Sequence, residues 1–327
     1  MRRRHSEIGA LLLLLGAVTP LTGQEQSAPE GGGATFLLLP VGARAAALGQ
    51  AAGADGGSSE AAFWNPAGLA RLPGSEIAVH YSKTFASDNT VVAGYYDAKR
   101  LGILGVAAYI VDFGSQEVLP GPGLPTGRIS VKNLEFLASY ATELLSDLTL
   151  GLNYKLIQFR QDCSGLCETV PTTVGTTHGV DVGLQYGFGA SDAFRVGLAV
   201  RHAGFKLQLQ NKEQADPLPT RVQFGMVYRV FLPRPAEATE GLDARFLLDI
   251  QDAWGQYDNP EFRAGVELGY GEVVRIRTGY AFLHSESSGP SVGVGFQFGR
   301  FAFDFARVFY ASSNFDEPVH ISLRAIL

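Results

Sequence analysis

The chain has 327 residues, a formal net charge of −6 at pH 7, and 46% hydrophobic residues. Because no basic stripe is present to neutralise phosphates, this charge argues against a nucleic-acid partner. A mean hydropathy of +0.08 does not separate a soluble protein from a membrane barrel, since only alternate residues of a barrel strand face lipid. The class of protein therefore has to be decided from the pattern of residues along the chain.

The first 23 residues are typical of a secretory signal peptide. Three arginines precede an apolar core over residues 8–18, and small and turn-forming residues follow as far as Gly23. Such a core is too short to span a bilayer as a helix, although an uncleaved anchor is the alternative. We therefore expect export and cleavage near Gly23. Residues 24–35 are polar and rich in glycine, and we predict a flexible lead-in there.

Residues 36–74 carry many small residues and no strand alternation, and we predict that they form a plug inside a barrel. A short helix is expected from Ala45 to Ala52, and a second one before the Asn65-Pro66 turn, where proline ends it. This turn has two interpretations. It is either the hinge of a movable hatch or only the bend that leads from the plug to the first strand.

From residue 75 to the end, apolar residues alternate with small or polar ones. In residues 148–156, for example, leucine and tyrosine alternate with threonine, glycine, asparagine and lysine. A period of two predicts strands with one apolar face. We predict an all-β fold, a membrane-spanning antiparallel β-barrel of about 14 strands over residues 75–327. The expected strands are 75–83, 89–98, 100–113, 128–142, 147–160, 176–189, 193–209, 220–231, 243–254, 260–270, 272–283, 289–298, 300–311 and 318–327.

The connections between these strands support a barrel. Four of the even-numbered ones are tight, whereas most odd-numbered ones are long, as in bacterial barrels with periplasmic turns and longer outside loops. The alternative, a large soluble β-sandwich, fits less well because the polar faces carry charged residues in mid-strand. We therefore expect the protein in the bacterial outer membrane, in contact with its lipids.

Only two cysteines are present, Cys163 and Cys167. In an oxidising compartment they are expected to form a disulfide that closes a small loop, with two free thiols as the alternative. The C-x-x-x-C spacing lacks the further ligands that zinc needs, so we predict no metal site.

The segment at 36–72 resembles the N-terminal signature of the PorV/PorQ family of outer-membrane proteins, which are FadL-like barrels. Two separated blocks carry the resemblance, one around residues 42–45 and one over residues 64–70. The motif residues are Gly42, Ala43, Arg44, Trp64, Asn65, Pro66, Ala67 and Gly68. The family's paired acids are reduced here to Asp55, which glycines follow.

The resemblance implies a fourteen-stranded barrel with an N-terminal hatch in its lumen. For PorV itself it implies work in type IX secretion, with secreted cargo proteins and secretion-system components as partners. For FadL-like members it implies passive uptake of hydrophobic small molecules across the outer membrane. We expect protein secretion and surface attachment, with hydrophobic transport as the alternative.

In FadL-like barrels a kink in the third strand opens a lateral path to the bilayer. Here the expected lateral gate comprises Gly102, Leu104, Gly105 and Val106, with the apolar side chains from Leu104 to Ile110 directed into the lumen. The alternative is that this face packs against plug residues such as Phe63, Trp64 and Leu69.

Charged residues on the sixth to eleventh strands are expected to face the lumen, because a lipid-facing charge costs about 2–4 kcal/mol at the midplane. They include Asp181, Arg195, Arg221, Arg229, Glu267 and Arg277. Such charges either form a stripe that binds anions or carboxylates, or pair across neighbouring strands and hold the plug.

Catalysis finds no support in the sequence. There is no G-x-S-x-G elbow, no H-E-x-x-H and no Walker loop, and the six histidines are scattered. We predict that the protein is not an enzyme and uses no cofactor.

Overall fold

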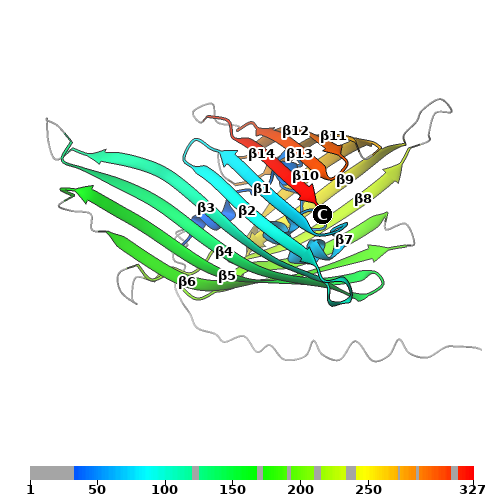
Figure 1. Cartoon of the computed structure of the whole chain (residues 1–327), viewed down its shortest axis with the longest axis horizontal. Helices are drawn as coiled ribbons and strands as arrows, with labels where there is room; N and C mark the ends of the chain where they lie inside the picture. Colours follow the sequence, from blue (N-terminus) through cyan, green and yellow to red (C-terminus); the bar gives the residue numbers. More distant parts are fainter. Residues whose placement is uncertain are drawn as a thin grey trace, which may run out of the picture. The chain divides into compact units, whose positions relative to one another are not determined.

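Fourteen antiparallel strands close into a barrel in which each strand pairs with its neighbour in sequence (Figure 1). The seam between the first and last strands is complete, with residue pairs running from Glu76↔Ile326 to Lys83↔Val319. The prediction of a closed antiparallel barrel of about 14 strands is confirmed.

Each predicted strand is present, with bounds that differ by a few residues. The strands are β1 (Glu76–Lys83), β2 (Asp88–Asp97), β3 (Ile103–Val118), β4 (Gly127–Leu145), β5 (Leu148–Gly165), β6 (Thr173–Phe188), β7 (Phe194–Gly204), β8 (Arg221–Phe231), β9 (Leu242–Ala253), β10 (Gln256–Tyr270), β11 (Val274–Phe282), β12 (Gly289–Phe298), β13 (Phe301–Val308) and β14 (Val319–Ile326).

A computed structural model describes residues 33–119, 125–167, 172–189, 193–209, 215–232, 241–271, 273–284, 287–310 and 316–327. The predicted signal peptide over residues 1–23, and the predicted lead-in as far as residue 32, lie outside the described residues. Residues 32–327 form one unit with its own interior. Among the described residues, no helix is long and apolar enough to cross a membrane.

The alternation along the strands separates an apolar outer face from a polar inner one. On β5, Leu152 and Tyr154 are exposed on the outside, whereas Asn153 and Lys155 are buried on the inside. The outward apolar side chains match what a lipid-facing band requires, and the inward charges avoid the cost of facing hydrocarbon. The inner face therefore sets the chemistry of the lumen.

On β3 the predicted assignment of faces is wrong. Leu104, Val106 and Ile110 are exposed on the outer face, whereas Tyr109 and Val111 are buried inside. The strand is apolar on both faces, so hydropathy alone could not decide which set points inward. Because side chains alternate with a period of two, an error of one residue exchanges the two faces completely.

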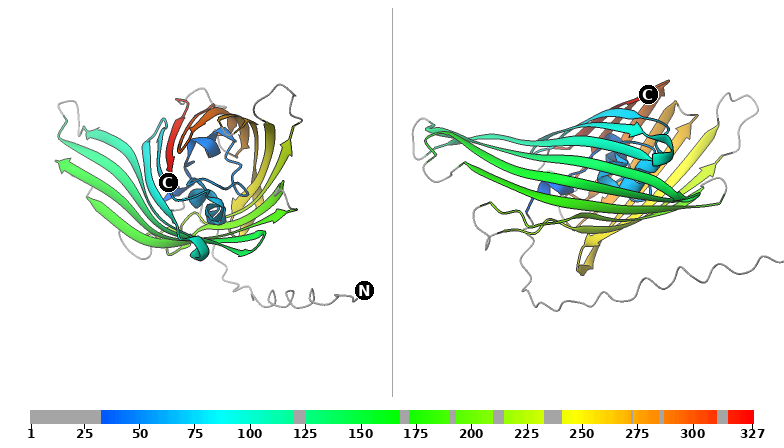
Figure 2. Two further views of the ribbon diagram at one scale, coloured as in Figure 1. Left: turned by 45° about the vertical axis from the view of Figure 1, so that its right-hand side comes forward. Right: turned by 60° about the horizontal axis from the view of Figure 1, so that its bottom comes forward.

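Residues 33–74, here called the luminal segment, lie within the ring of strands (Figure 2). Four short helices form the segment: η1 (Thr35–Leu38), α1 (Ala43–Ala47), α2 (Ala61–Trp64) and η2 (Pro66–Arg71). A third 3-10 helix, η3 (Lys99–Leu101), forms the turn between β2 and β3.

The first α-helix is shorter than predicted and begins earlier. It ends at Ala47, and the next residues include Gly49 and Gln50 at φ of 63° and 66°. This left-handed backbone stops the helix before the predicted end at Ala52. The resulting turn directs the chain toward the barrel wall.

One apolar core joins the luminal segment to β2, β3 and β4. Phe36, Phe63 and Trp64 belong to the same buried cluster as Tyr109 and Leu137. The Tyr109 ring lies 6.1 Å from the Phe36 ring and 6.1 Å from the Phe63 ring, measured between centroids. This side of the lumen is therefore filled by hydrophobic contact, while smaller apolar clusters join the segment to β8, β9 and β13.

Candidate functional site

Seven inward-facing glycines of the wall make room for the backbone of the luminal segment. A Cβ atom at any of them would lie within 3.0 Å of an atom of the segment, and at Gly183 it would overlap Asn65 Oδ1. Three pairs face each other across neighbouring strands. The seven are Gly151, Gly183, Gly197, Gly225, Gly265, Gly279 and Gly293, and the opposed pairs are Gly151↔Gly183, Gly197↔Gly225 and Gly265↔Gly279. The segment thus lies directly against the wall over much of the circumference.

The Asn65-Pro66 turn is fully enclosed and is bonded both within the luminal segment and to the wall strand β6. Asn65 Nδ2 donates to the carbonyl oxygen of Gly53 at 2.7 Å and to that of Leu184 on β6 at 3.2 Å. Its Oδ1 accepts from the backbone N–H of Ala67 at 3.1 Å and so caps η2. These bonds make the turn a rigid link between the luminal segment and β6, which agrees with the structural interpretation of the motif.

The other motif residues make contacts within the luminal segment and with β14. Gly42 has a φ of 93°, and a Cβ atom there would overlap the Glu60 side chain. The backbone N–H of Ala43 donates to Ser322 Oγ on β14 at 2.8 Å. Trp64 Nε1 donates to the carbonyl oxygen of Val41 at 3.0 Å, which joins the two halves of the segment.

Gly68 packs in a similar way, because a Cβ atom there would lie 2.6 Å from the carbonyl oxygen of Asp55. The motif residues therefore come together in one tightly packed unit.

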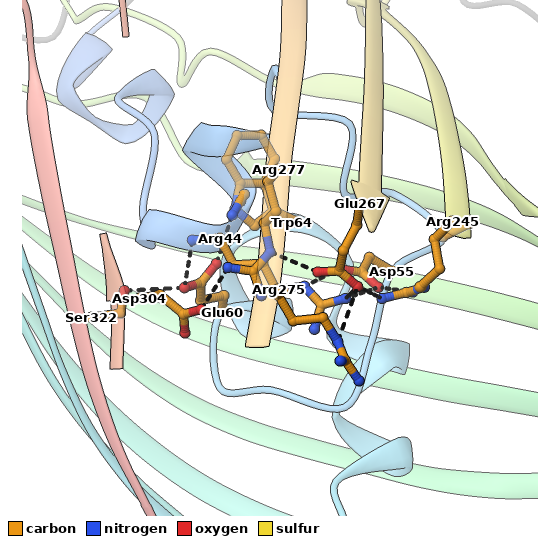
Figure 3. A network of polar contacts seen from close by, with 12 residues as sticks. Arg44, Asp55, Glu60, Trp64, Arg245, Glu267, Arg275, Arg277, Asp304 and Ser322 are labelled. Carbon is orange, nitrogen blue, oxygen red and sulfur yellow. Dashed lines mark hydrogen bonds and ion pairs between the residues drawn. The ribbon is translucent and has the colours of Figure 1, made fainter. Parts of the chain in front are cut away.

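Glu267 on β10 is the centre of an ion-pair network that joins the segment to the wall (Figure 3). Its carboxylate lies 2.6 Å from Arg277 Nε, 3.1 Å from Arg245 Nη1 and 3.5 Å from Arg44 Nη2. Asp55 extends the network, since it contacts both Arg44, at 3.0 Å, and Arg245. Asp55 thus takes part in acid-mediated contacts.

The network continues to the seam of the barrel. Asp304 on β13 lies 2.6 Å from Arg277 Nη1 and 3.1 Å from Arg324 Nη2 on β14. Although burial disfavours a charged guanidinium, Asp55 and Glu267 raise the pKa of Arg44 above its usual range. Arg44 is therefore the cation through which the luminal segment is bound to the wall.

Glu60 anchors the start of α1. Its carboxylate accepts from the backbone N–H groups of Arg44 and Ala45, at 3.2 and 2.9 Å, and from Ser322 Oγ at 3.1 Å. Burial, and next the nearby Asp304 carboxylate, raise the pKa of the Glu60 carboxyl. Sequence reasoning missed Glu60, for which a lone acid within a run of small residues was the only signal.

A second charged cluster surrounds Lys155 on β5. Its ammonium lies 2.9 Å from Glu135 on β4, 2.9 Å from Asp181 on β6 and 3.0 Å from His202 Nδ1. Asp181 also accepts from the backbone N–H of His202 at 2.7 Å, where β7 bulges and His202 has a φ of 58°. Asn153 links this cluster to the segment.

The six predicted luminal charges all lie on the inner face, but they belong to different groups. Glu267 and Arg277 meet in the first network, and Asp181 lies in the second. Arg195 donates to the carbonyl oxygen of Ala54 at 3.4 Å, and Arg229 pairs with Asp243 at 3.0 Å. Arg221 lines the outer cavity that is described next. They do not form a single stripe.

The outer cavity, of about 300 Å³, opens at the end of the barrel with the longer connections. Its lining combines apolar residues of the luminal segment, the loops and the strand ends with polar and charged residues of β7 to β10. The apolar ones include Leu38, Leu39, Pro40, Trp64, Phe85, Phe113, Leu283, Val308 and Tyr310, and the polar ones include Arg201, Arg221, Gln251, Glu261 and Arg263.

Two neighbouring cavities of about 360 and 260 Å³ lie on the opposite side of the luminal segment, toward the tight turns. They share Arg44, Arg229 and Arg275, and together we call them the arginine basin. Their acidic residues are Asp243, Glu267 and Asp304. The arginines are Arg44, Arg71, Arg195, Arg229, Arg245, Arg275, Arg277 and Arg324.

The region predicted as a lateral gate is closed in this structure. β3 pairs without interruption with β2 from Ile103 to Asp112, and with β4 over the same residues. Gly102 has a φ of 94° and belongs to the turn before the strand, while Gly105 faces the Tyr95 ring on the inner side. Leu104 and Val106 point outward, so of the four residues only Gly105 faces the lumen.

The two cysteines are not among the residues that line these cavities. Cys163 and Cys167 form a disulfide at the tip of β5, beside the start of β4. Among the described residues, no group of three or more histidine, cysteine or acidic side chains is arranged to hold a metal ion.

Comparisons with known proteins place the fold. No family model matches the chain, and no curated protein matches it. The toluene transporter TbuX of Ralstonia pickettii aligns with a TM-score of 0.57 and 14% identity, over 88% of this chain and 98% of that one. The chain therefore shares the fold of this transporter.

Two further solved structures agree. The monoaromatic hydrocarbon channel CymD has a TM-score of 0.59 and 12% identity, over 89% of this chain and 98% of its own. The P. putida toluene transporter TodX has a TM-score of 0.52 and 12% identity, over 86% and 96%. At identities this low, the structural alignments show a shared fold alone. Nothing among the comparisons supports the PorV/PorQ assignment or the secretion role, and both stay predictions.

Proposed function

We propose that this protein lets small hydrophobic molecules cross the outer membrane passively. The observation that carries the proposal is the outer cavity, which lies toward the longer connections and combines a large apolar lining with polar groups. Small-molecule sites are usually concave, apolar and lined by a few polar groups. Solved barrels of the same fold include toluene transporters and a monoaromatic hydrocarbon channel, which supports this class of ligand.

The outer cavity adjoins the apolar core beside β2 and β3. Trp64 lines the outer cavity, and it belongs to the buried cluster that also contains Tyr95, Ile103, Ala107 and Tyr109 on β2 and β3. Straight passage along the barrel axis is opposed by the glycine contacts and ion pairs that hold the luminal segment. We therefore place the exit through the wall beside β3, next to Gly105.

The proposal predicts toluene uptake that depends on the outer cavity. Ala86 is exposed at the cavity, and Ala86→Trp should fill it and reduce uptake of radiolabelled toluene at least tenfold, in a host that lacks its own hydrocarbon channels. Ala98→Trp, in the β2–β3 turn at the other end, is the matched control and should leave uptake unchanged. Equal uptake with and without the protein would reject the proposal.

The exit beside β3 predicts that a locked wall stops transport. Val106 and Ala138 face each other across β3 and β4, so cysteines at both positions can be cross-linked. We expect the oxidised Val106→Cys/Ala138→Cys protein to lose at least tenfold in toluene uptake, and a reductant to restore it. The control pair Val182→Cys/Val200→Cys joins β6 to β7 and should have no effect. Unchanged uptake through the locked β3–β4 wall would place the exit elsewhere.

A further inference from the structure

The arginine basin is strongly cationic although the chain as a whole is acidic. Eight arginines line it, against three acidic residues. Asp55 and Glu76 pair with Arg245 and Arg324, and when they are added the balance is still eight guanidinium groups against five carboxylates. The protein carries a net charge of −6, so this excess is local.

Arg229 and Arg275, at the edge of the basin, are only partly engaged by carboxylates. Arg275 donates to the carbonyl oxygens of Gly271 and Val274, and its distance to the Glu267 carboxylate is 4.0 Å. Arg229 makes an ion pair with Asp243 and keeps 40% of its side chain exposed. Figure 3 shows Arg275 at the margin of the ion-pair network.

A cavity lined by guanidinium groups favours an anionic ligand. Guanidinium groups present forked N–H donors that match the oxygens of phosphates and carboxylates, and low-dielectric walls concentrate the field of like charges in a cleft. A volume of about 360 Å³ accommodates a small molecule and not a folded protein. We infer that the basin binds a small oxyanion that carries several negative charges on phosphate or carboxylate groups.

This site differs from the proposed path for hydrophobic molecules, because the luminal segment separates it from the outer cavity. By the usual orientation of bacterial barrels, its tight-turn end faces the periplasm. Since Arg44 comes from the segment and Arg229 and Arg275 from β8 and β11, a bound anion bridges the segment and the wall. Binding should therefore stabilise the whole unit.

Inorganic pyrophosphate and citrate are suitable probes for the purified full-length protein in detergent. We expect both to raise the melting temperature and to bind measurably by calorimetry, relative to sodium chloride at equal ionic strength. Arg229→Gln/Arg275→Gln should weaken binding at least tenfold. Arg128→Gln, on the exposed part of β4, is the control and should change binding less than twofold. An equal effect of sodium chloride, or unchanged binding by the double variant, would overturn the inference.

A second measurement needs no variant and so does not depend on refolding. An arginine-specific reagent, read by mass spectrometry, should modify Arg229, Arg275 and Arg128 of the wild-type protein. Pyrophosphate should slow modification of Arg229 and Arg275 at least fivefold and leave Arg128 unaffected. Protection of all three, or of none, would show that no specific site exists. Toluene uptake is measured separately, so failure here leaves the proposed function standing.

Discussion

Gly183→Val should prevent the barrel from closing around its luminal segment. The first atom of any side chain at this position would overlap Asn65 Oδ1 and would lie 3.0 Å from Pro66 Cδ. Neither neighbour can move easily, because Asn65 is bonded to two parts of the backbone and proline is rigid. Overpacking in a core typically lowers the free energy of unfolding by ~1–3 kcal/mol. Because both neighbours of the new side chain are rigid, we expect a loss at the upper end of this range or beyond it.

The measurement is the melting temperature in detergent, together with the gel mobility shift that distinguishes folded from unfolded barrels. Gly94→Val on β2 is the matched control, because it also adds a β-branched side chain to a strand glycine and nothing lies within 4 Å of a Cβ atom there. We expect the control to melt close to the wild type. If the two variants were equally stable, the segment would not press against the wall at β6.

Glu267→Gln should destabilise the protein by about 3–5 kcal/mol, the usual effect of removing one partner from a buried ion pair. The change keeps the side-chain volume but leaves Arg44, Arg245 and Arg277 without the carboxylate at their centre. Only 2% of the Glu267 side chain is exposed, so water cannot replace the lost charge. The loss should appear in the free energy of unfolding by denaturant, followed by tryptophan fluorescence.

A surface pair provides the comparison. Glu117 lies 3.8 Å from Arg128, and both side chains are more than half exposed. Glu117→Gln should therefore change the free energy of unfolding by less than about 0.5 kcal/mol. A loss of similar size in both variants would mean that the effect of Glu267 reflects overall charge and not its position in the network.

The strands could be predicted because apolar and polar residues alternate with a period of two along each one. The alternation predicts a strand over 289–298, and β12 of the structure spans Gly289–Phe298. The inner and outer faces followed wherever one face was polar, as on β5. On β3 both faces are apolar, so the sequence contained no signal for the side that points inward, and only pairing with β2 and β4 decides it.

The side-chain contacts across neighbouring strands were the part that the sequence could not supply. The sequence predicts Asp181 as a luminal charge, but only the register of the strands places the Lys155 ammonium of β5 at 2.9 Å from both Asp181 and Glu135 on β4. The wall glycines were visible one by one as inward small residues. Their common role appears only when the luminal segment is seen against them.

The enclosure of the luminal segment has a consequence for biogenesis. The segment precedes β1 in the chain, and the seam that completes the ring joins β1 to β14, which are separated by almost the whole barrel sequence. Pairing of such distant strands is slow, because a long loop must be ordered first. Asn65 and Pro66 lie against Gly151 and Gly183 with no room for a Cβ atom between them. We therefore expect the wall to form around the segment, with the segment in position before the seam closes.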